Sequence, residues 1–350
     1  MKFACTILIA CIILLSGCKQ DLQIASSQYV DTPVIYGLLN LHDYGSDGNT
    51  HYIRIQKGYL LKGNAYLATG ITDSIYYPDN LNVKLFPSNG TNPFTLNRID
   101  GSTVGLNKDT GIFANAHNYL YTFYGYLDST QSYTLVVTRN GGTDTVAMAT
   151  TALVNNWQIF SPSNLGYSTI NFSNVPGQEA VMSWSPAQNA GVYDLKIRFF
   201  YREYAEATNT LQKDTFIDIP IFTSLIPSGA SGSQTLTYTL PSSIILHYLA
   251  RNLVTDPTLY REFKTMQFKF AAGGTGLASY FNAQQAQSGL TSSNALPIFT
   301  NVTGGVGLLS SREYQEIDNI GLSNMGLDSL ACDPTANFLK FKNSSGNTCN

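Results

Sequence analysis

Cys18 is the residue whose surroundings most clearly predict a chemical modification. It closes the tetrapeptide Leu15-Ser16-Gly17-Cys18, which follows Lys2 and an apolar run over residues 3–15. A run of about 13 residues has the length of a signal-peptide core and is shorter than the roughly 20 residues of a spanning helix. Residues 1–17 are therefore predicted to be a lipoprotein signal peptide, and the Cys18 thiol to carry a diacylglycerol. The alternative is an unmodified Cys18 after an ordinary signal peptide or in a buried helix.

The residues after Cys18 predict where the lipid anchor would hold the protein. Acyl chains on the thiol and the amine bind a membrane durably, since each buried methylene contributes about 0.8 kcal/mol. The second mature residue is Lys19 instead of Asp, so nothing marks the protein for the inner membrane. We expect an outer-membrane protein on the periplasmic face or at the cell surface, with residues 18–31 as a tether. Lys19-Gln20-Asp21 partly matches a short charged signal for surface export.

Cys332 and Cys349 are the candidates for a disulfide bond. Of the five cysteines, two leave with the signal peptide and Cys18 is lipidated, so this pair remains. In an oxidising compartment, closing their loop would contribute about 3 kcal/mol in the chain-entropy model. The alternative is two reduced thiols near a frayed terminus.

Motifs of common enzyme mechanisms are missing from the sequence. It has no Gly-x-Ser-x-Gly or His-Glu-x-x-His motif, and Gly273-Gly274-Thr275-Gly276 lacks the lysine of a phosphate-binding loop. His42 and His51 flank residues 43–49, but that loop has neither zinc-ligand nor calcium-ligand spacing. The other histidines, His117 and His247, are isolated. The sequence therefore predicts no catalytic residue, no metal and no cofactor.

Two segments are candidates for binding. A glycine-rich turn over residues 301–311 contains Asn301, Gly304, Gly305 and Gly307, where a partner's backbone could approach closely. A bulged hairpin explains the same glycines and is the favoured alternative. A tyrosine-rich strand offers rings for stacking on sugars, although core packing is favoured for its residues Tyr119, Tyr121, Tyr124 and Tyr126.

Four short triplets resemble a bacterial acceptor for O-linked glycans. Each begins with Asp, followed by Ser or Thr; the candidate acceptors are Ser74, Ser129, Thr145 and Ser329. One or two such triplets would arise by chance. Ser329 is expected to be the most accessible acceptor, and Thr145 to lie within a strand.

The candidate residues must be positioned by the protein's secondary structure, which composition and patterning predict to be mainly β. Without Lys2, 19 basic and 23 acidic side chains remain, a net charge of −4 that excludes nucleic acid as a partner. Short β-branched and aromatic runs over residues 34–39, 51–56, 81–86, 119–123, 132–137 and 144–148 predict antiparallel strands. Residues 32–155 are therefore expected to form an immunoglobulin-like sandwich. Asn140-Gly141 is predicted to be its type I′ hairpin turn.

Residues 156–325 are expected to form a second, fibronectin-like sandwich decorated with helices. Trp184 is a candidate core residue, and Tyr193, Leu195, Ile197 and Phe199 alternate on one face. A helix is predicted from Pro241 to the stop at Asp256-Pro257, and a second over residues 276–287. Residues 326–350 are expected to be a C-terminal tail.

Several segments resemble the uncharacterised outer-membrane lipoproteins of Bacteroidota-type bacteria, which have domains of unknown function. These segments are Tyr36-Gly37-Leu38-Leu39 and residues 51–57, 73–77, 268–274 and 299–312, so the likeness spans nearly the whole mature chain. The resemblance implies an envelope location and an association with nutrient-import machinery. It carries no catalytic residues to transfer.

Two classes of function follow from the sequence. The favoured class is a non-catalytic envelope lipoprotein, a binding or assembly subunit whose partners are the membrane, through its anchor, and an outer-membrane protein or a glycan. The alternative is a secreted-type hydrolase of polysaccharide or peptide, with an active site assembled from dispersed residues. A pocket that gathers Asp, Glu or His would favour the hydrolase, and an aromatic or polar surface would favour binding.

Overall fold

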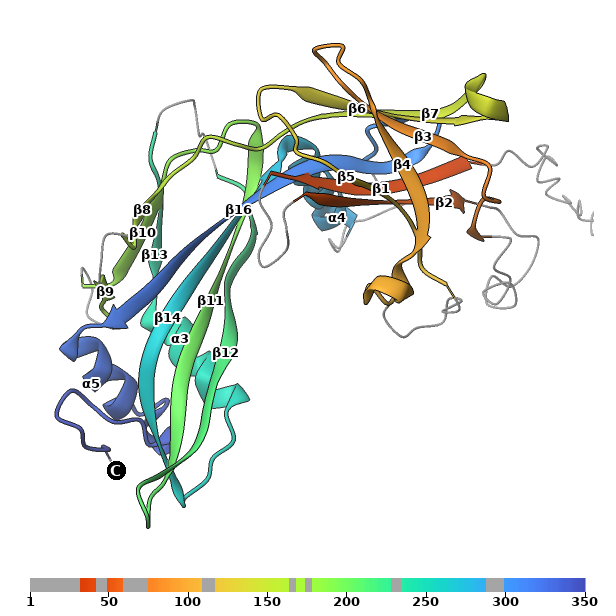
Figure 1. Cartoon of the computed structure of the whole chain (residues 1–350). Helices are drawn as coiled ribbons and strands as arrows, with labels where there is room; N and C mark the ends of the chain where they lie inside the picture. Colours follow the sequence, from red (N-terminus) through yellow and green to blue (C-terminus); the bar gives the residue numbers. More distant parts are fainter. Residues whose placement is uncertain are drawn as a thin grey trace, which may run out of the picture.

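The computed structural model describes residues 32–41, 49–58, 75–108, 117–163, 168–173, 178–227, 234–287 and 299–349. Within these ranges the protein is mainly β, with one 13-stranded mixed sheet and one three-stranded sheet. The ribbon forms two bodies set at an angle to each other (Figure 1). Two separate antiparallel sandwiches were predicted. Instead, the large sheet continues through both bodies and includes a parallel pair.

The first body folds part of the large sheet over its own core. The turning point is β4 (Phe94–Asp100), because residues 94–96 pair with β3 (Asn82–Pro87) and residues 97–100 pair with β5 (Tyr119–Tyr124). Fully buried side chains such as Ile53 and Leu135 come from the two halves of the fold. The other strands of this body are β1 (Thr32–Asn40), β2 (Thr50–Gly58), β6 (Ser132–Arg139) and β7 (Asp144–Ala152). Between β6 and β7, Asn140 and Gly141 both take positive φ, as predicted. The predicted type I′ turn is wrong, because Arg139 pairs with Asp144 and residues 140–143 form a longer loop that contains the 3-10 helix η3 (Asn140–Gly142).

One long strand, β16 (Val306–Leu322), belongs to both bodies. Its residues 306–312 run parallel to β1, and its residues 312–320 pair antiparallel with β14 (Leu259–Gly274). The preceding β15 (Val302–Thr303) pairs with β7, and Val302 and Leu309 are buried in the core of the first body. Residues 302–312 were assigned to the second domain on their position in the chain. That assignment is corrected, because strand pairing over a long sequence separation brings them back to the first body.

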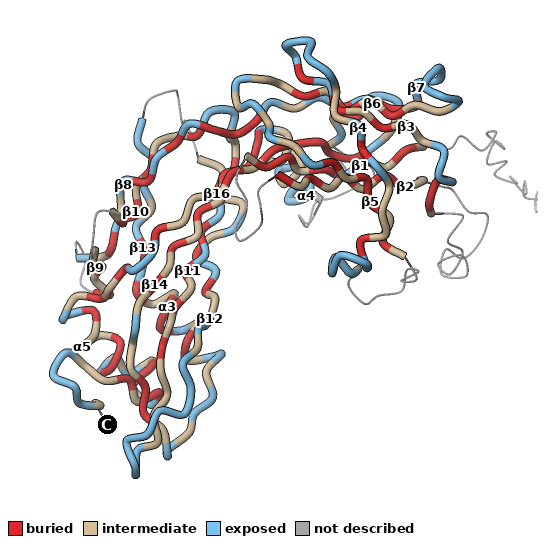
Figure 2. The backbone as a smooth tube through the Cα atoms, viewed as in Figure 1, coloured by how far each residue is buried: buried red, intermediate tan, exposed pale blue. Residues whose placement is uncertain are grey.

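The second body is a sheet of long antiparallel strands with an aromatic inner face. β11 (Ala190–Ala205) lies between β12 (Thr210–Leu225) and β14, and β16 follows β14. Trp184 is fully buried against this face, as predicted, with its ring 5.8 Å from that of Phe270. Alternate positions along these strands are buried (Figure 2). The short strands of this body are β8 (Ile159–Ser161), β9 (Thr169–Ile170), β10 (Ala180–Trp184) and β13 (Leu236–Leu240).

Both predicted helices form in this part of the chain. α3 (Ser242–Asn252) begins directly after Pro241 and packs Ile245 and Leu249 into the core. It ends four residues before Asp256, earlier than expected. α4 (Thr275–Gln287) follows β14 and lies where the two bodies meet (Figure 1). None of the helices in the described ranges has the length and apolarity required to cross a membrane.

The expected C-terminal tail is an integral part of the second body. Residues 324–332 form α5 (Asn324–Cys332), and the side chains of Leu339 and Phe341 are fully buried. A disulfide joins Cys332 to Cys349, with their Cα atoms 4.9 Å apart. The buried Arg261 donates to the Leu339 carbonyl at 3.0 Å and pairs with Glu203. Burial of apolar side chains across the segment therefore corrects the prediction of a tail.

Candidate functional site

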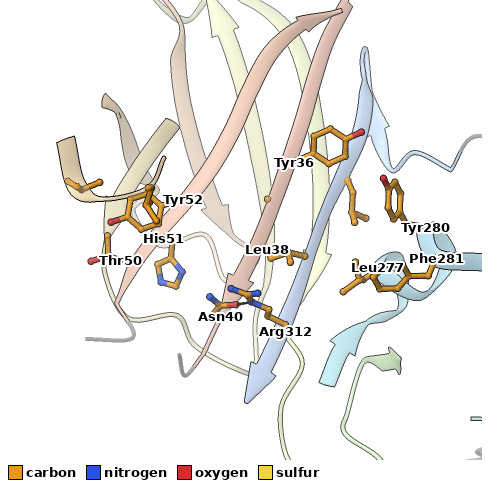
Figure 3. Close-up of a pocket in the computed structure, with 14 residues that line it drawn as sticks. Tyr36, Leu38, Asn40, Thr50, His51, Tyr52, Leu277, Tyr280, Phe281 and Arg312 are labelled. Atoms are coloured by element: carbon orange, nitrogen blue, oxygen red, sulfur yellow. Dashed lines mark hydrogen bonds between the residues drawn. The ribbon is translucent and has the colours of Figure 1, made fainter. Parts of the chain in front are cut away.

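A cavity of about 870 Å³ lies between the first body and α4. Its volume is in the range of about 300–1,000 Å³ that is usual for ligand sites. Side chains from β1, β2, α4 and β16 point into it (Figure 3). We call this cavity the aromatic groove. It is defined by the lining residues Tyr36, Gly37, Leu38, Asn40, Thr50, His51, Tyr52, Val104, Leu106, Leu277, Tyr280, Phe281, Leu308 and Arg312.

The floor of the aromatic groove is the outer face of the first body's sheet. Because successive residues of a strand point to opposite faces, Ile35 and Leu39 fill the core while Tyr36 and Leu38 face the groove. Strand register then brings Arg312 of β16 beside Asn40 of β1. The floor therefore combines aromatic, aliphatic and polar side chains from strands that are distant in sequence.

Helix α4 forms one wall of the groove. Leu277, Tyr280 and Phe281 share a helical face because they are three and four residues apart. The helix sits close to β11, since a Cβ on Gly191 would lie only 2.8 Å from the Cβ of Ala278. The Tyr280 ring meets the Tyr36 ring edge-on, at 6.5 Å between centroids. Burial, together with the neighbouring Tyr280, raises the pKa of the Tyr36 phenol, so the Tyr36 ring stays neutral near pH 7.

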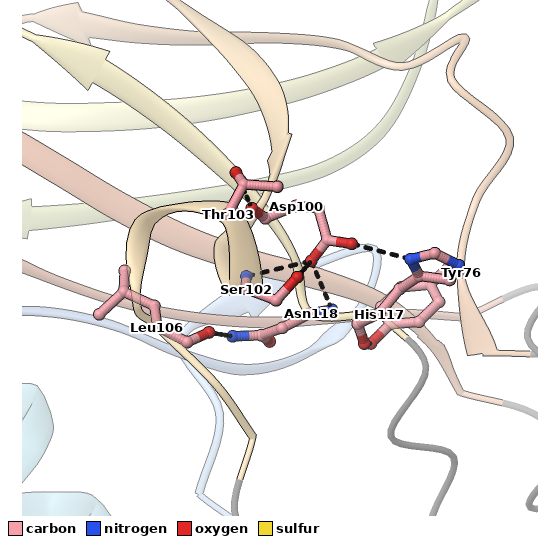
Figure 4. Close-up of polar contacts among 7 residues, drawn as sticks. All are labelled: Tyr76, Asp100, Ser102, Thr103, Leu106, His117 and Asn118. Carbon is pink, nitrogen blue, oxygen red and sulfur yellow. Dashed lines mark hydrogen bonds and ion pairs between the residues drawn. The ribbon is translucent and has the colours of Figure 1, made fainter.

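The opposite wall is the short 3-10 helix η2 (Gly101–Val104) and the residues just after it. Val104 and Leu106 present exposed apolar side chains to the groove. The Asp100 carboxylate holds the start of this wall by accepting from the Ser102 N–H at 3.1 Å and the Asn118 N–H at 3.0 Å. The Asn118 amide in turn donates to the Leu106 carbonyl at 2.7 Å. These bonds form one connected cluster beside the groove (Figure 4).

His117 belongs to this cluster. The prediction that it is isolated is therefore wrong. Its Nδ1 donates to Asp100 at 2.8 Å, and its ring stacks on that of Tyr119 at 5.0 Å. The Ser102 hydroxyl donates to Asp100 and not to His117, so the three residues do not form a serine–histidine relay. The cluster therefore positions the wall. His247, the other histidine predicted to be isolated, is exposed on α3, and its ring is hydrogen-bonded to the Ser243 carbonyl of the same helix.

We expect the Asp100 cluster to make the stability of the first body depend on pH. The bond from His117 and the backbone bond from Asn118 hold the pKa of the Asp100 carboxyl well below its usual value of about 4. A lowered pKa in the folded state means that this stabilisation is complete above about pH 4 and is lost as the pH falls further.

Urea unfolding between pH 7 and pH 2.5 checks this expectation. Asp100→Asn should lower the free energy of unfolding by about 1–3 kcal/mol at pH 7, and its difference from wild type should shrink towards pH 2.5. Asp79→Asn, which removes an exposed carboxylate on the same body, is the matched control. A constant difference between the Asp100 variant and wild type at every pH would contradict the assigned role.

The glycine-rich turn makes its close contacts inside the protein. An added Cβ would lie 2.5 Å from the Val146 oxygen at Gly304, 2.5 Å from the Pro33 oxygen at Gly305 and 1.9 Å from the Ile35 oxygen at Gly307. Asn301 closes the hairpin through bonds to both backbone groups of Leu309. The glycine backbone therefore lies against β1 and β7 of the same protein and not against a partner. Asn301 and the three glycines form the junction between these strands and β16. The glycines have a structural role, but the favoured alternative of a bulged hairpin inside the second domain is wrong, because β15 pairs with β7 and β16 with β1.

The tyrosine-rich strand β5 does not present one continuous surface. Core packing, the favoured prediction, is correct for Tyr121, which is buried. It is wrong for Tyr124 and for Tyr126, just after the strand, since both are exposed. Tyr119 is held between His117 and Arg98, whose guanidinium carbon lies 3.8 Å from the ring centre. Tyr124 alone lies next to the groove, because it pairs with Thr50.

The predicted modification sites differ in accessibility. Cys18 and Ser74 lie outside the described residues, as do His42 and residues 43–48 of the tested metal loop. Thr145 lies in β7, as predicted, and is exposed. Ser329 is half-buried within α5 and is not the most accessible acceptor. Ser129 is half-buried within a turn that Asp128 closes. No group of three metal-ligating side chains gathers in the part of the chain that the structure describes.

Sequence reasoning missed the residues of the aromatic groove. Tyr36 and Leu38 were quoted only as part of a strand, and Tyr280 and Phe281 only as part of a helix. One signal was available in the sequence. The strand and the helix both carry apolar side chains on two faces, whereas packing against a single core requires them on only one. Comparison of the chain with models of protein families and with curated proteins finds no match. The resemblance to envelope lipoproteins therefore stays a prediction.

Proposed function

We propose that this protein is a lipid-anchored envelope lipoprotein that binds a segment of glycan in the aromatic groove and does not cleave it. The observation that carries the proposal is the convergence of Tyr36, Tyr52, Tyr280 and Phe281 on one cavity. Aromatic rings offer large rigid surfaces at a low cost in conformational entropy, and the faces of sugar rings stack on them. Asn40 and Thr50 add polar groups at the end of the groove, where sugar hydroxyls need hydrogen-bond partners.

Binding is favoured over hydrolysis by the composition of the lining. Most glycosidases use two carboxyl groups separated by about 5–10 Å. The described residues that line the aromatic groove include aromatic rings, a guanidinium and one histidine but no Asp or Glu. That histidine, His51, stacks on Phe123 and its Nε2 lies 3.2 Å from the Gly125 carbonyl oxygen. The Asp100 carboxylate is near the groove, but its oxygens are occupied by the bonds that build the wall.

Location follows from the predicted anchor. Lipid on Cys18 would hold the protein at the outer membrane, on its periplasmic face or at the cell surface, with residues 19–31 as a spacer before β1. We further propose that the two bodies act as sandwich-like modules, one carrying the groove and the other available to an outer-membrane protein of the import machinery. The resemblance to Bacteroidota-type lipoproteins supports the same arrangement.

The proposal is tested by calorimetric titration of the purified protein, without its lipid, with a panel of soluble oligosaccharides. Tyr280→Ala should weaken binding by about tenfold or more, because it removes the ring that closes the groove. Phe338→Ala, which truncates an exposed ring on the second body, is the matched control and should bind like wild type.

Two outcomes would contradict the proposed function. One is an equal affinity of wild type and Tyr280→Ala for every oligosaccharide that binds. The other is the appearance of new reducing ends during incubation with a polysaccharide, which would favour the hydrolase instead.

A further inference from the structure

Resting on the proposed function, we propose that the glycan bound in the aromatic groove is acidic and that Arg312 binds a sugar carboxylate. The cation lies at one end of the groove beside Asn40, and the Tyr36 and Tyr280 rings lie towards the other (Figure 3). A ligand with an aromatic-stacking face and one negative charge would match both ends.

The hydrogen bonding of Arg312 leaves part of its guanidinium available. Its Nε donates to the Asn40 Oδ1 at 2.7 Å, and its guanidinium carbon lies 4.9 Å from the centre of the Tyr314 ring. Among the described residues Arg312 forms no ion pair, and its two terminal nitrogens donate to none of them. Because Asn40 occupies Nε alone, both terminal nitrogens can still donate to a ligand in the groove that Arg312 lines.

Arg198, Arg202 and Arg261 have carboxylate partners, whereas Arg54 bonds the Asn118 side chain and Arg98 bonds the Tyr77 carbonyl. Arg198 binds Asp218 through two hydrogen bonds of 2.7 and 2.9 Å, and the buried Arg261 pairs with Glu203. Arg312 is half-buried in a groove whose described lining contains no carboxylate. It also lines a smaller cavity of about 210 Å³ together with Asp194, whose Oδ1 accepts from the Ser224 N–H at 2.6 Å. A partly desolvated guanidinium gains most from an anion that it can bind in bidentate geometry. The planar carboxylate of a hexuronic acid has that geometry, and its sugar ring extends the contact towards Phe281 and Tyr280.

A matched pair of ligands tests the charge alone. Oligogalacturonate and its fully methyl-esterified form share one backbone and differ in the carboxylate. Wild type should bind the acid at least about tenfold more tightly than the ester, and the preference should fall with added salt. Arg312→Gln should abolish the preference, so that within this variant acid and ester bind with equal affinity whatever the affinity itself is. Arg251→Gln, which removes an exposed arginine from α3, should retain the preference.

The outcomes separate the two proposals. Equal, salt-independent affinity of wild type for acid and ester, with Tyr280→Ala weakening both, would overturn the acidic ligand and leave glycan binding in place. Failure of wild type to bind any oligosaccharide would overturn the proposed function. Tighter binding of a sulfated oligosaccharide or an acidic peptide than of any uronate would reject the carboxylate-bearing sugar. The salt titration of wild type needs no variant, so the inference stays testable if Arg312→Gln does not fold.

Discussion

Replacing Cys18 with alanine should abolish the incorporation of labelled fatty acid into this protein. The predicted acyl groups attach to the Cys18 sulfur and, after removal of residues 1–17, to its amine. Alanine has no thiol, so the thioether cannot form and the signal for lipoprotein processing is lost. Metabolic labelling with palmitate followed by immunoprecipitation measures the effect, which is expected to be complete loss of label.

A matched variant shows whether the loss of label is specific to Cys18 or follows from the loss of any cysteine. Cys5→Ala changes a cysteine inside the removed segment and should keep full labelling. Exchanging residues 1–18 for an ordinary cleavable signal peptide should also move the protein from the membrane pellet to the soluble periplasmic fraction. Label retained on the Cys18→Ala protein would refute the lipoprotein interpretation.

Gly307→Ala should be the most destabilising single-methyl addition at the junction of the two bodies. Gly307 has φ of +121° and pairs with Ile35 in the parallel ladder between β1 and β16. A Cβ there would lie 1.9 Å from the Ile35 oxygen, so the backbones must separate and the ladder must break at this point. We expect a loss of about 3 kcal/mol or more in the free energy of unfolding, measured by urea denaturation.

Gly90→Ala provides the control for this prediction. Gly90 also has positive φ, +74°, but an added Cβ would meet nothing within 4 Å. The control should therefore cost only about 1 kcal/mol, the conformational penalty alone. Equal stability of the two variants would contradict the structural role assigned to the glycine-rich turn. If the turn instead bound a partner, Gly307→Ala would weaken that association without lowering stability.

Local sequence patterns predicted much of the secondary structure. The alternation of Tyr193, Leu195, Ile197 and Phe199 predicted a strand with one buried face, and all four side chains are buried in β11. Pro241 marked the start of a helix, and Asn140-Gly141 marked a hairpin turn. Each of these signals acts between residues close in the chain, through side-chain periodicity or backbone conformation. They could therefore be read without knowing the partners of each strand.

The boundary between the two bodies could not be read in this way. Residues 302–312 follow the second body's helices in sequence but pair with β1 and β7 of the first body. The pairing of β16 with β1 joins residues more than 250 positions apart, and nothing local in either strand specifies the other. The glycines predicted a close approach of backbone, but the partner of that approach was fixed by strand register.

The aromatic groove shows the same division between local and long-range information. The sequence was sufficient for the mainly β class. The anchor at Cys18 is a prediction that can be made from the sequence alone, because processing enzymes recognise a contiguous segment. The groove required folding, since Asn40 and Arg312 are separated by 272 positions and come within hydrogen-bond distance only through the parallel ladder. The sequence shows which side chains the protein has. The packing of the strands and α4 decides which of them surround Arg312, and it leaves no carboxylate in the described lining of the groove.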